Sequence, residues 1–332
     1  MCKKLTLEGS KMCITKEFEQ KVYAGRCVAR DEALLLAEEP LEELTAAANR
    51  IRETMCGNRF DMCTIINGKC GRCSEDCKYC AQSVHYHTNC QQAYPLLATE
   101  VLLEGARRNQ EQGVLRYSIV TSGRRLSDEE VEQACGSIRE IRRQTGIDVC
   151  VSFGLLAEEQ FRKLKDAGAS RVHCNLETSR AYFPKVCTTH TYDEKIETLR
   201  AAMSAGLSVC SGGIMGLGET MEDRIDMALT LRDLGVKSVP VNMLNPIEGT
   251  PYENNRILTN DELCRIVALF RFIIPDGDIR LAGGRGLVGD KGAKCFESGA
   301  NAAISGDMLT TAGITVATDH ALVRGLGYEV RK

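Results

Sequence analysis

The sequence predicts an α/β fold, a (β/α)8 TIM-type barrel preceded by a helical extension. Two observations carry this prediction. Eight short apolar runs alternate with longer segments of helical pattern, which is the order of elements in such a barrel. Seven of the helical segments end in glycine just before an apolar run, and glycine is favoured there because it tolerates the left-handed conformation that stops a helix.

Each apolar run is too short for a helix and is therefore expected to be a strand. The eight runs cover residues 62–66, 115–121, 147–153, 171–176, 207–212, 238–244, 278–282 and 301–305. The glycines that end helices before them are Gly113, Gly146, Gly168, Gly206, Gly235, Gly277 and Gly299. Capping boxes are expected at Ser127 with Glu130, Thr191 with Glu194, and Thr259 with Glu262. A doubly wound open sheet is the rival fold, but no G-x-G-x-x-G motif follows the first strand.

The first part of the chain reads as helices without strands. Residues 31–37 carry a helical pattern, and Pro40 opens a second one over residues 41–48. No linker rich in proline or serine divides the chain. We therefore expect a single domain, with a helical extension over residues 1–60 and the barrel over residues 61–332.

The balance of charge excludes several classes of partner. The 332 residues include 42 basic and 45 acidic ones, and a net charge of −3 gives no electrostatic case for binding nucleic acid or an anionic membrane. No run approaches the roughly 18–20 apolar residues of a membrane span. Residues 1–6 lack the apolar segment of a secretory signal, so a cytoplasmic location is expected.

The count of 17 cysteines is odd, which argues against a disulfide framework. Metal binding, catalysis and plain burial are the remaining uses of these thiols. Cysteines outside any pattern are expected to be structural or exposed: Cys2, Cys13, Cys27, Cys56, Cys70, Cys90, Cys135, Cys187, Cys264 and Cys295. Among them Cys187, in the loop after the fourth predicted strand, is the candidate for contact with a functional site.

The strongest motif is the C-x3-C-x2-C formed by Cys73, Cys77 and Cys80. It directly follows the first predicted strand, at the face where a barrel carries its chemistry. Three thiolates at this spacing can hold three irons of a four-iron cluster, and the fourth iron is then open to substrate or cofactor. Zinc is the alternative, with a fourth ligand drawn from Cys70, His85, His87 or Cys90.

This motif, with an aromatic residue before its last cysteine, is typical of radical S-adenosylmethionine enzymes. Further segments match in order, and from about residue 30 onward the chain resembles the biotin synthase family. The matching segments are residues 73–83, 175–179, 210–214, 216–220, 240–244 and 309–311. The resemblance implies sulfur insertion into dethiobiotin, driven by S-adenosylmethionine that a [4Fe-4S] cluster on the motif cysteines cleaves.

The resemblance also implies roles for individual residues. It places Tyr79 near the adenine of S-adenosylmethionine, Glu177 at the ribose hydroxyls, and Arg116 on the S-adenosylmethionine side. It gives Asn175 and Asn242 hydrogen bonds to the ribose and to the ureido ring of dethiobiotin. The dethiobiotin carboxylate is assigned to Thr310 and Thr311. Without the resemblance, Asn, Thr and Glu at strand ends would read as loop caps.

Members of the family carry an auxiliary iron–sulfur cluster, held by three cysteines and one arginine, that donates the sulfur. Cys150, Cys210 and Arg280 match three of these ligands, but the third cysteine position holds Ser118. Serine ligates iron poorly, so the usual binuclear cluster is in doubt.

Barrel geometry offers a replacement ligand. Interior side chains come in layers of four from alternate strands, so Cys63 on the first strand could share a layer with Cys150, Cys210 and Arg280. Cys174 is the competitor, but alternation along its strand is expected to turn it outward. Three thiolates from three sides suit a four-iron cluster with an extra sulfide, and a [2Fe-2S] cluster is the alternative.

The resemblance further implies a flavodoxin or ferredoxin as electron donor, and a homodimer. Two other readings stay open. The chain could be a different radical enzyme with the same barrel, such as a hydrogenase maturase or a mutase. It could also be a scaffold without activity that holds an iron–sulfur cluster or zinc.

Overall fold

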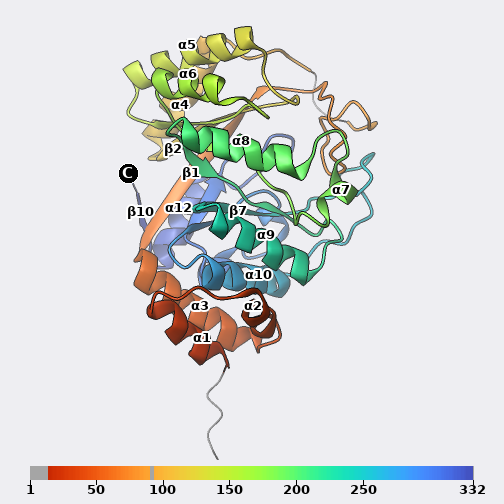
Figure 1. Cartoon of the computed structure of the whole chain (residues 1–332). Helices are drawn as coiled ribbons and strands as arrows, with labels where there is room; N and C mark the ends of the chain where they lie inside the picture. The colour runs from red at the N-terminus through yellow and green to blue at the C-terminus, as the bar shows by residue number, and fades with distance from the viewer. Residues whose placement is uncertain (1–13, 90–92, 332) are drawn as a thin grey trace, which may run out of the picture.

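The computed structural model describes residues 14–89 and 93–331 and shows the expected closed barrel of parallel strands (Figure 1). Neighbouring strands pair in the order β1-β2-β3-β4-β5-β7-β8-β9, and β9 pairs back with β1 to close the ring. The strands are β1 (Arg59–Lys69), β2 (Arg116–Thr121), β3 (Asp148–Ser152), β4 (Ala169–His173), β5 (Ser208–Cys210), β6 (Gly213–Met215), β7 (Ser238–Met243), β8 (Asp278–Leu281), β9 (Ala302–Ser305) and β10 (Glu329–Val330). The short β10 pairs with the start of β1.

All eight predicted strands are present, but the fifth, expected over residues 207–212, ends at Cys210, and an unpredicted strand, β6, follows it and shares its position in the barrel. Both pair with β7, and the break lies opposite Pro240 in the middle of β7. Proline has no N–H to donate to a sheet, so the ladder is interrupted at this point. Gly212 lies in the break, where a Cβ atom would stand only 1.9 Å from the Pro240 carbonyl oxygen.

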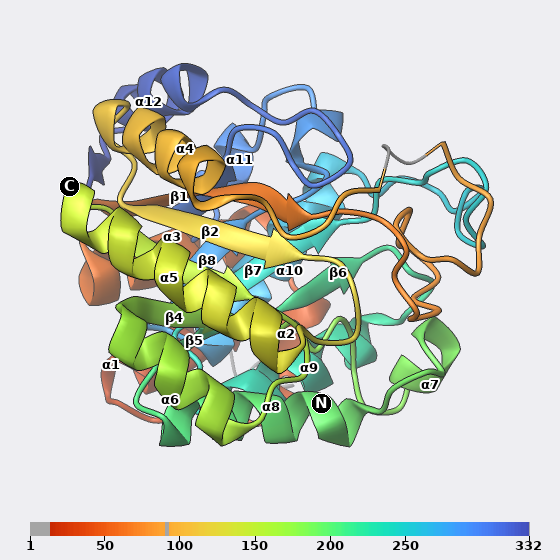
Figure 2. The ribbon, with the colours of Figure 1, turned by 90° about the horizontal axis from the view of Figure 1, so that it is seen from above.

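Helices surround the barrel, and the loops after the strands gather at one end of it (Figure 2). In that view the arrowheads of β1 and β2 point toward the side that holds α7 and the loop after β1. The helices are α1 (Ile14–Tyr23), α2 (Arg30–Ala37), α3 (Leu41–Cys56), α4 (Thr99–Glu111), α5 (Asp128–Gln144), α6 (Glu158–Ala167), α7 (Phe183–Val186), α8 (Tyr192–Ser204), α9 (Met221–Asp233), α10 (Asn260–Ile273), α11 (Ala293–Phe296) and α12 (Val316–Gly325).

The N-terminal helices pack on the outside of the barrel. Helix α3 lies against α10, and α2 lies against α9 (Figure 1). Arg30 at the start of α2 forms an ion pair with Asp226 of α9. The division of the chain at residue 60 stays a prediction, since β1 begins at Arg59.

The three predicted capping boxes are confirmed at the starts of α5, α8 and α10. A fourth box, Thr220 with Asp223, begins α9 and escaped prediction because aspartate stands where glutamate is usual. Five of the seven predicted glycines have a positive φ. Gly146 does not, because the chain leaves α5 through Thr145 in an extended conformation, and Gly277 does not, because it lies four residues beyond the end of α10 at Ile273.

The break in the fifth strand generates a prediction. Gly212→Ala should lower the free energy of unfolding by about 3 kcal/mol or more, because the new methyl group meets backbone rather than a movable side chain. Gly136→Ala is the control, since its Cβ would meet no atom within 4 Å and alanine favours the helix by roughly 1 kcal/mol. Thermal unfolding midpoints of both variants check this, and a Gly212→Ala midpoint equal to that of the unmodified chain would contradict it.

Candidate active site

A cavity of about 390 Å³ runs through the interior of the barrel to the loop after β1. Of the residues predicted for the site, all except Thr311 line it. They are Cys63, Cys73, Cys77, Tyr79, Cys80, Arg116, Cys150, Asn175, Glu177, Cys210, Asn242, Arg280 and Thr310. Residues that lie more than 200 positions apart in the sequence therefore line the same cavity.

The loop that carries Cys73, Cys77 and Cys80, here called the motif loop (residues 70–89), is held by its own backbone. Cys73 N–H donates to the Gln82 carbonyl, and the Val84 N–H donates to the Cys73 carbonyl. The Cys80 N–H closes a turn onto the Cys77 carbonyl. These bonds fold the loop into a compact turn with its three thiols on the cavity wall.

The arrangement of thiols disfavours a zinc ion held by the three motif cysteines together. A tetrahedral zinc ion holds its ligand atoms about 3.5–3.8 Å apart. Across residues 14–89 and 93–331, the one group of three His, Cys, Asp or Glu ligands that close together is Cys77, Cys187 and His190, so Cys73 and Cys80 join no such site. A four-iron cluster spreads its thiolates over separate irons and fits the wider spacing. Cys90, one of the alternative zinc ligands, lies outside the described residues, as do Cys2 and Cys13.

Deeper in the barrel, Cys63, Cys150 and Cys210 are buried on the cavity wall, on β1, β3 and β5. Arg280 comes from β8, and its Nη1 lies 3.4 Å from the Cys63 Sγ atom. These are the four residues that the sequence predicts to share one layer of the barrel interior. Ser118 lies beside Cys150 in the paired strands, and its buried side chain faces the same cavity.

The three deep thiols differ in acidity. Burial raises the pKa of Cys63 to about 11 and that of Cys150 to about 12. Burial would also raise the pKa of Cys210, but a hydrogen bond with His173 and the charge of Arg280 bring it down to about 7. A thiolate is the form that binds iron, so Cys210 is the deep thiol nearest to its ligating state.

Below these thiols, the Asp61 side chain is completely buried and binds Arg280 at 2.5 Å and Arg116 at 3.4 Å. Burial alone would raise the pKa of Asp61, but these two guanidinium groups hold it well below its usual range. Nε of Arg280 is buried without a hydrogen-bond partner. A cationic donor without an acceptor beside three thiols fits an anionic iron–sulfur group.

Two predicted positions are wrong. Arg116 was expected on the S-adenosylmethionine side, but it begins β2 at the opposite end of the barrel and pairs with Asp61 and with Asp148 at 2.8 Å. Cys174 was expected to face outward, yet it lines the cavity. Strand β4 ends at His173, so alternation no longer governs residue 174.

The cofactor-side residues follow β4. Glu177 has a left-handed backbone, with φ of 71°, an uncommon conformation for a residue with a side chain. Its Oε2 atom is buried without a hydrogen-bond partner, so the carboxylate has a free acceptor. Burial and the nearby Glu177 charge raise the pKa of Tyr79, which keeps its phenol protonated. Oδ1 of Asn175 accepts from the Gly212 N–H.

The Asn242 amide, on β7, links the backbones of the two neighbouring strands, β6 and β8. Its Nδ2 donates to the Gly213 carbonyl at 3.0 Å, and its Oδ1 accepts from the Gly283 N–H at 2.9 Å. Thr310 lines the main cavity. Thr311 instead lines an adjoining cavity of about 440 Å³ that shares Ile304 and Met308 with the main one.

Several residues of the site had not been assigned a role from the sequence. Arg171 and His173 stand two residues apart on β4 and both face the cavity. Their spacing in the sequence could therefore have indicated that both point inward. Lys195 reaches the cavity from the first turns of α8, and nothing in the sequence distinguishes it from a surface lysine. Cys187 was expected to approach the site, and its Sγ atom lies 3.7 Å from that of Cys77.

Comparison with known proteins identifies the family. Residues 69–231 match the model of the radical SAM superfamily, and residues 240–329 match the biotin and thiamin synthesis associated domain. A biotin synthase of Akkermansia muciniphila is 59% identical over 96% of this chain and 99% of its own length. Biotin synthase 2 of Corynebacterium diphtheriae is 58% identical over 95% of this chain and 96% of its own length.

Solved structures agree on the fold. A methylornithine synthase superposes with a TM-score of 0.81 over 95% of this chain and 97% of its own, at 19% identity. An FeFe-hydrogenase maturase from Carboxydothermus hydrogenoformans superposes with a TM-score of 0.80 over 95% of this chain and 79% of its own, at 17% identity. These likenesses show the barrel fold. The radical SAM match and the relatives at 58–59% identity show the family: the chain belongs to the biotin synthase family.

Proposed function

We propose that this protein converts dethiobiotin to biotin by inserting sulfur in a radical reaction that consumes S-adenosylmethionine. The observation that carries the proposal is the single cavity between two sets of thiols. Cys73, Cys77 and Cys80 lie at its loop end, and Cys63, Cys150 and Cys210 lie deep in the barrel. A substrate held between the sets would face a radical source on one side and a sulfur source on the other.

At the loop end, a [4Fe-4S] cluster on the three motif cysteines supplies the electron that cleaves S-adenosylmethionine reductively. The residues around it bind and orient that molecule. The free acceptor of Glu177 suits the paired ribose hydroxyls, and the half-buried Tyr79 ring suits the adenine. Asn175 keeps its Nδ2 group for the ribose while its Oδ1 fixes the β5–β6 break.

Deep in the barrel, Cys63, Cys150 and Cys210 hold the auxiliary cluster, with Arg280 as its cationic neighbour. The three thiols approach from β1, β3 and β5, which suits three corners of a four-iron cluster better than two irons that share four ligands. Arg280, whose Nε has no partner, would donate a hydrogen bond to the extra sulfide of such a cluster, and the cluster would supply the sulfur atom of the product. Arg116 balances charge beneath this cluster rather than contacting S-adenosylmethionine.

Dethiobiotin lies between the two clusters. Asn242 offers its amide to the ureido ring, and Thr310 offers its hydroxyl to the carboxylate at the far end of the aliphatic chain. Thr311 borders the adjoining cavity, which gives the carboxylate end a second wall. The largely apolar lining excludes water from the radical step.

The resemblance to the family supports two partners. We propose that a flavodoxin or ferredoxin supplies low-potential electrons and that two copies of the chain form a homodimer. We also propose that the reaction takes place in the cytoplasm. No helix in the described part of the chain is both long and apolar enough to cross a membrane. The solved methylornithine synthase and hydrogenase maturase are under 20% identical to this chain, whereas the biotin synthases are 58–59% identical, which disfavours the hydrogenase maturase and mutase alternatives.

The radical site generates the first functional prediction. Cys77→Ala should abolish reductive cleavage of S-adenosylmethionine, because two thiolates cannot keep a cluster with one open iron. Release of 5′-deoxyadenosine under strong reductant, measured by chromatography, checks this. Cys27→Ala removes an exposed thiol away from the cavity and is the control. Undiminished 5′-deoxyadenosine from Cys77→Ala would remove the motif from the mechanism.

The substrate-binding residue Asn242 generates the second functional prediction. Asn242→Ala should weaken dethiobiotin binding by roughly 1–3 kcal/mol, because a buried ureido group loses its partner. Asn255→Ala is the matched control, since its amide also donates to a backbone carbonyl but does not line the cavity. Isothermal titration calorimetry with dethiobiotin measures the dissociation constant of each variant. If Asn242→Ala and Asn255→Ala bind dethiobiotin equally well, the ureido ring lies elsewhere.

The deep thiols generate the third functional prediction. Cys63→Ala should reduce the iron content from roughly eight to roughly four per chain, and biotin formation should cease while 5′-deoxyadenosine release continues. Cys174→Ala tests the competing thiol and should keep both clusters. Mössbauer spectra and iron analysis provide the readout. A binuclear auxiliary cluster, or full iron content in Cys63→Ala, would refute this ligand set.

A further inference from the structure

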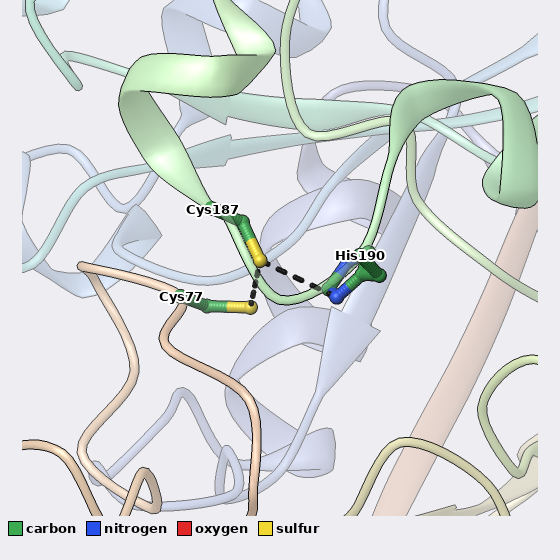
Figure 3. Close-up of side chains that lie close together, drawn as sticks. All are labelled: Cys77, Cys187 and His190. Carbon is green, nitrogen blue, oxygen red and sulfur yellow. Dashed lines mark hydrogen bonds between the residues drawn. The ribbon is translucent and has the colours of Figure 1, made fainter.

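A second group of metal-ligating side chains adjoins the motif loop, and only Cys77 in it has a part in the function proposed above. Cys187 and His190 lie in the loop between α7 and α8, and Cys77 faces them from the motif loop (Figure 3). The two Sγ atoms are 3.7 Å apart, and the Cys187 Sγ lies 3.3 Å from Nδ1 of His190. All three ligand atoms lie within 4.8 Å of one another.

These separations suit a single metal ion. A tetrahedral ion bonded to sulfur at about 2.3 Å and to nitrogen at about 2.0–2.1 Å holds its ligand atoms about 3.5–3.8 Å apart. The distances from Cys187 to Cys77 and to His190 are close to that range. Little movement of the side chains is therefore needed to admit an ion.

The two loops that supply the ligands are joined by hydrogen bonds. The Asp76 carboxylate accepts from the backbone N–H groups of Thr188 at 2.8 Å and Thr189 at 3.1 Å. The Lys78 N–H donates to the Val186 carbonyl at 3.0 Å. Because these bonds flank Cys77 on one loop and Cys187 on the other, the ligands are held in place before any ion arrives.

The surroundings also suit a cation. Cys187 and His190 are buried, with 2% and 7% of their surfaces exposed. Glu75 Oε2 lies 2.6 Å from Nδ1 of His190 and also pairs with Arg124. When an ion takes Nδ1, this carboxylate remains beside the imidazole as a charge partner. The buried Cys187 thiolate and the half-buried Cys77 thiolate form a neutral unit with a divalent ion, whereas the two thiolates alone would carry uncompensated charge.

We propose that, in the chain without its motif cluster, Cys77, Cys187 and His190 bind one divalent ion of the Fe²⁺ or Zn²⁺ class. Thiolate and imidazole ligands select such ions over Mg²⁺ and Ca²⁺. The ion displaces the protons of both thiols to solvent, the Nδ1 proton moves to Nε2 so that a neutral imidazole binds, and the fourth position of the ion stays open. Since Cys77 is also a ligand of the proposed cluster, the ion and the cluster exclude one another, and this exclusion alone rests on the proposed function.

The test uses Co²⁺ as the probe on the full chain, free of iron and kept without oxygen. A Cys150→Ala background removes one thiol of the deep set, so that absorption from that site does not confuse the result. One Co²⁺ per chain should bind, with intense thiolate-to-cobalt absorption. Cys187→Ser should lower the affinity for Co²⁺ at least ten-fold. His190→Gln removes another ligand and should also lower the affinity for Co²⁺. Cys135→Ser removes a buried thiol in α5 and should change nothing.

Two further variants separate this site from the cluster. Cys73→Ala should keep the cobalt absorption but fail to assemble the motif cluster, while Cys187→Ser should assemble it and show its reduced electron paramagnetic resonance signal. Cobalt absorption that survives in Cys187→Ser, or disappears in Cys73→Ala, would overturn the single-ion site. A Cys73→Ala chain that still assembles the cluster would instead contradict the proposed cluster ligands and would leave the single-ion site standing.

Discussion

The buried ion pair between Asp61 and Arg280 is the interaction on which the deep end of the barrel depends. Neither side chain reaches solvent, so each charge would be prohibitively costly without the other. Asp61 holds Arg280 beside Cys63, and Arg280 also donates to the Asp61 and Ala303 carbonyls. The guanidinium therefore ties β1, β8 and β9 together at the point where the barrel closes.

Much of the fold could be predicted because its signals are local. Short apolar runs and the glycines before them mark strands and helix ends through backbone preferences alone. The split of β5 from β6 could not be predicted in this way. It depends on Pro240 in the neighbouring strand, and the sequence shows neither which residue faces Gly212 nor how closely.

In the candidate site, too, the sequence predicts what depends on regular local structure and misses what depends on residues distant in the sequence. The position of Cys63 next to Arg280 follows from strict alternation in layers of a barrel, which is a property of regular strands. Cys174 and Arg116 were misplaced for two different reasons. Cys174 lies beyond the regular part of β4, and Arg116 is oriented by two carboxylates, Asp61 and Asp148, whose proximity only the folded chain reveals.

The strand β10 and the residue after it have a practical consequence. Strand β10 runs beside the start of β1, and Arg331 lies 3.6 Å from Asp61, beneath the deep thiols. Arg331 thus adds a third guanidinium, after those of Arg280 and Arg116, beside the buried Asp61 carboxylate. Substitution of Arg331 would therefore disturb the charge balance around Asp61, although the two residues lie 270 positions apart in the sequence.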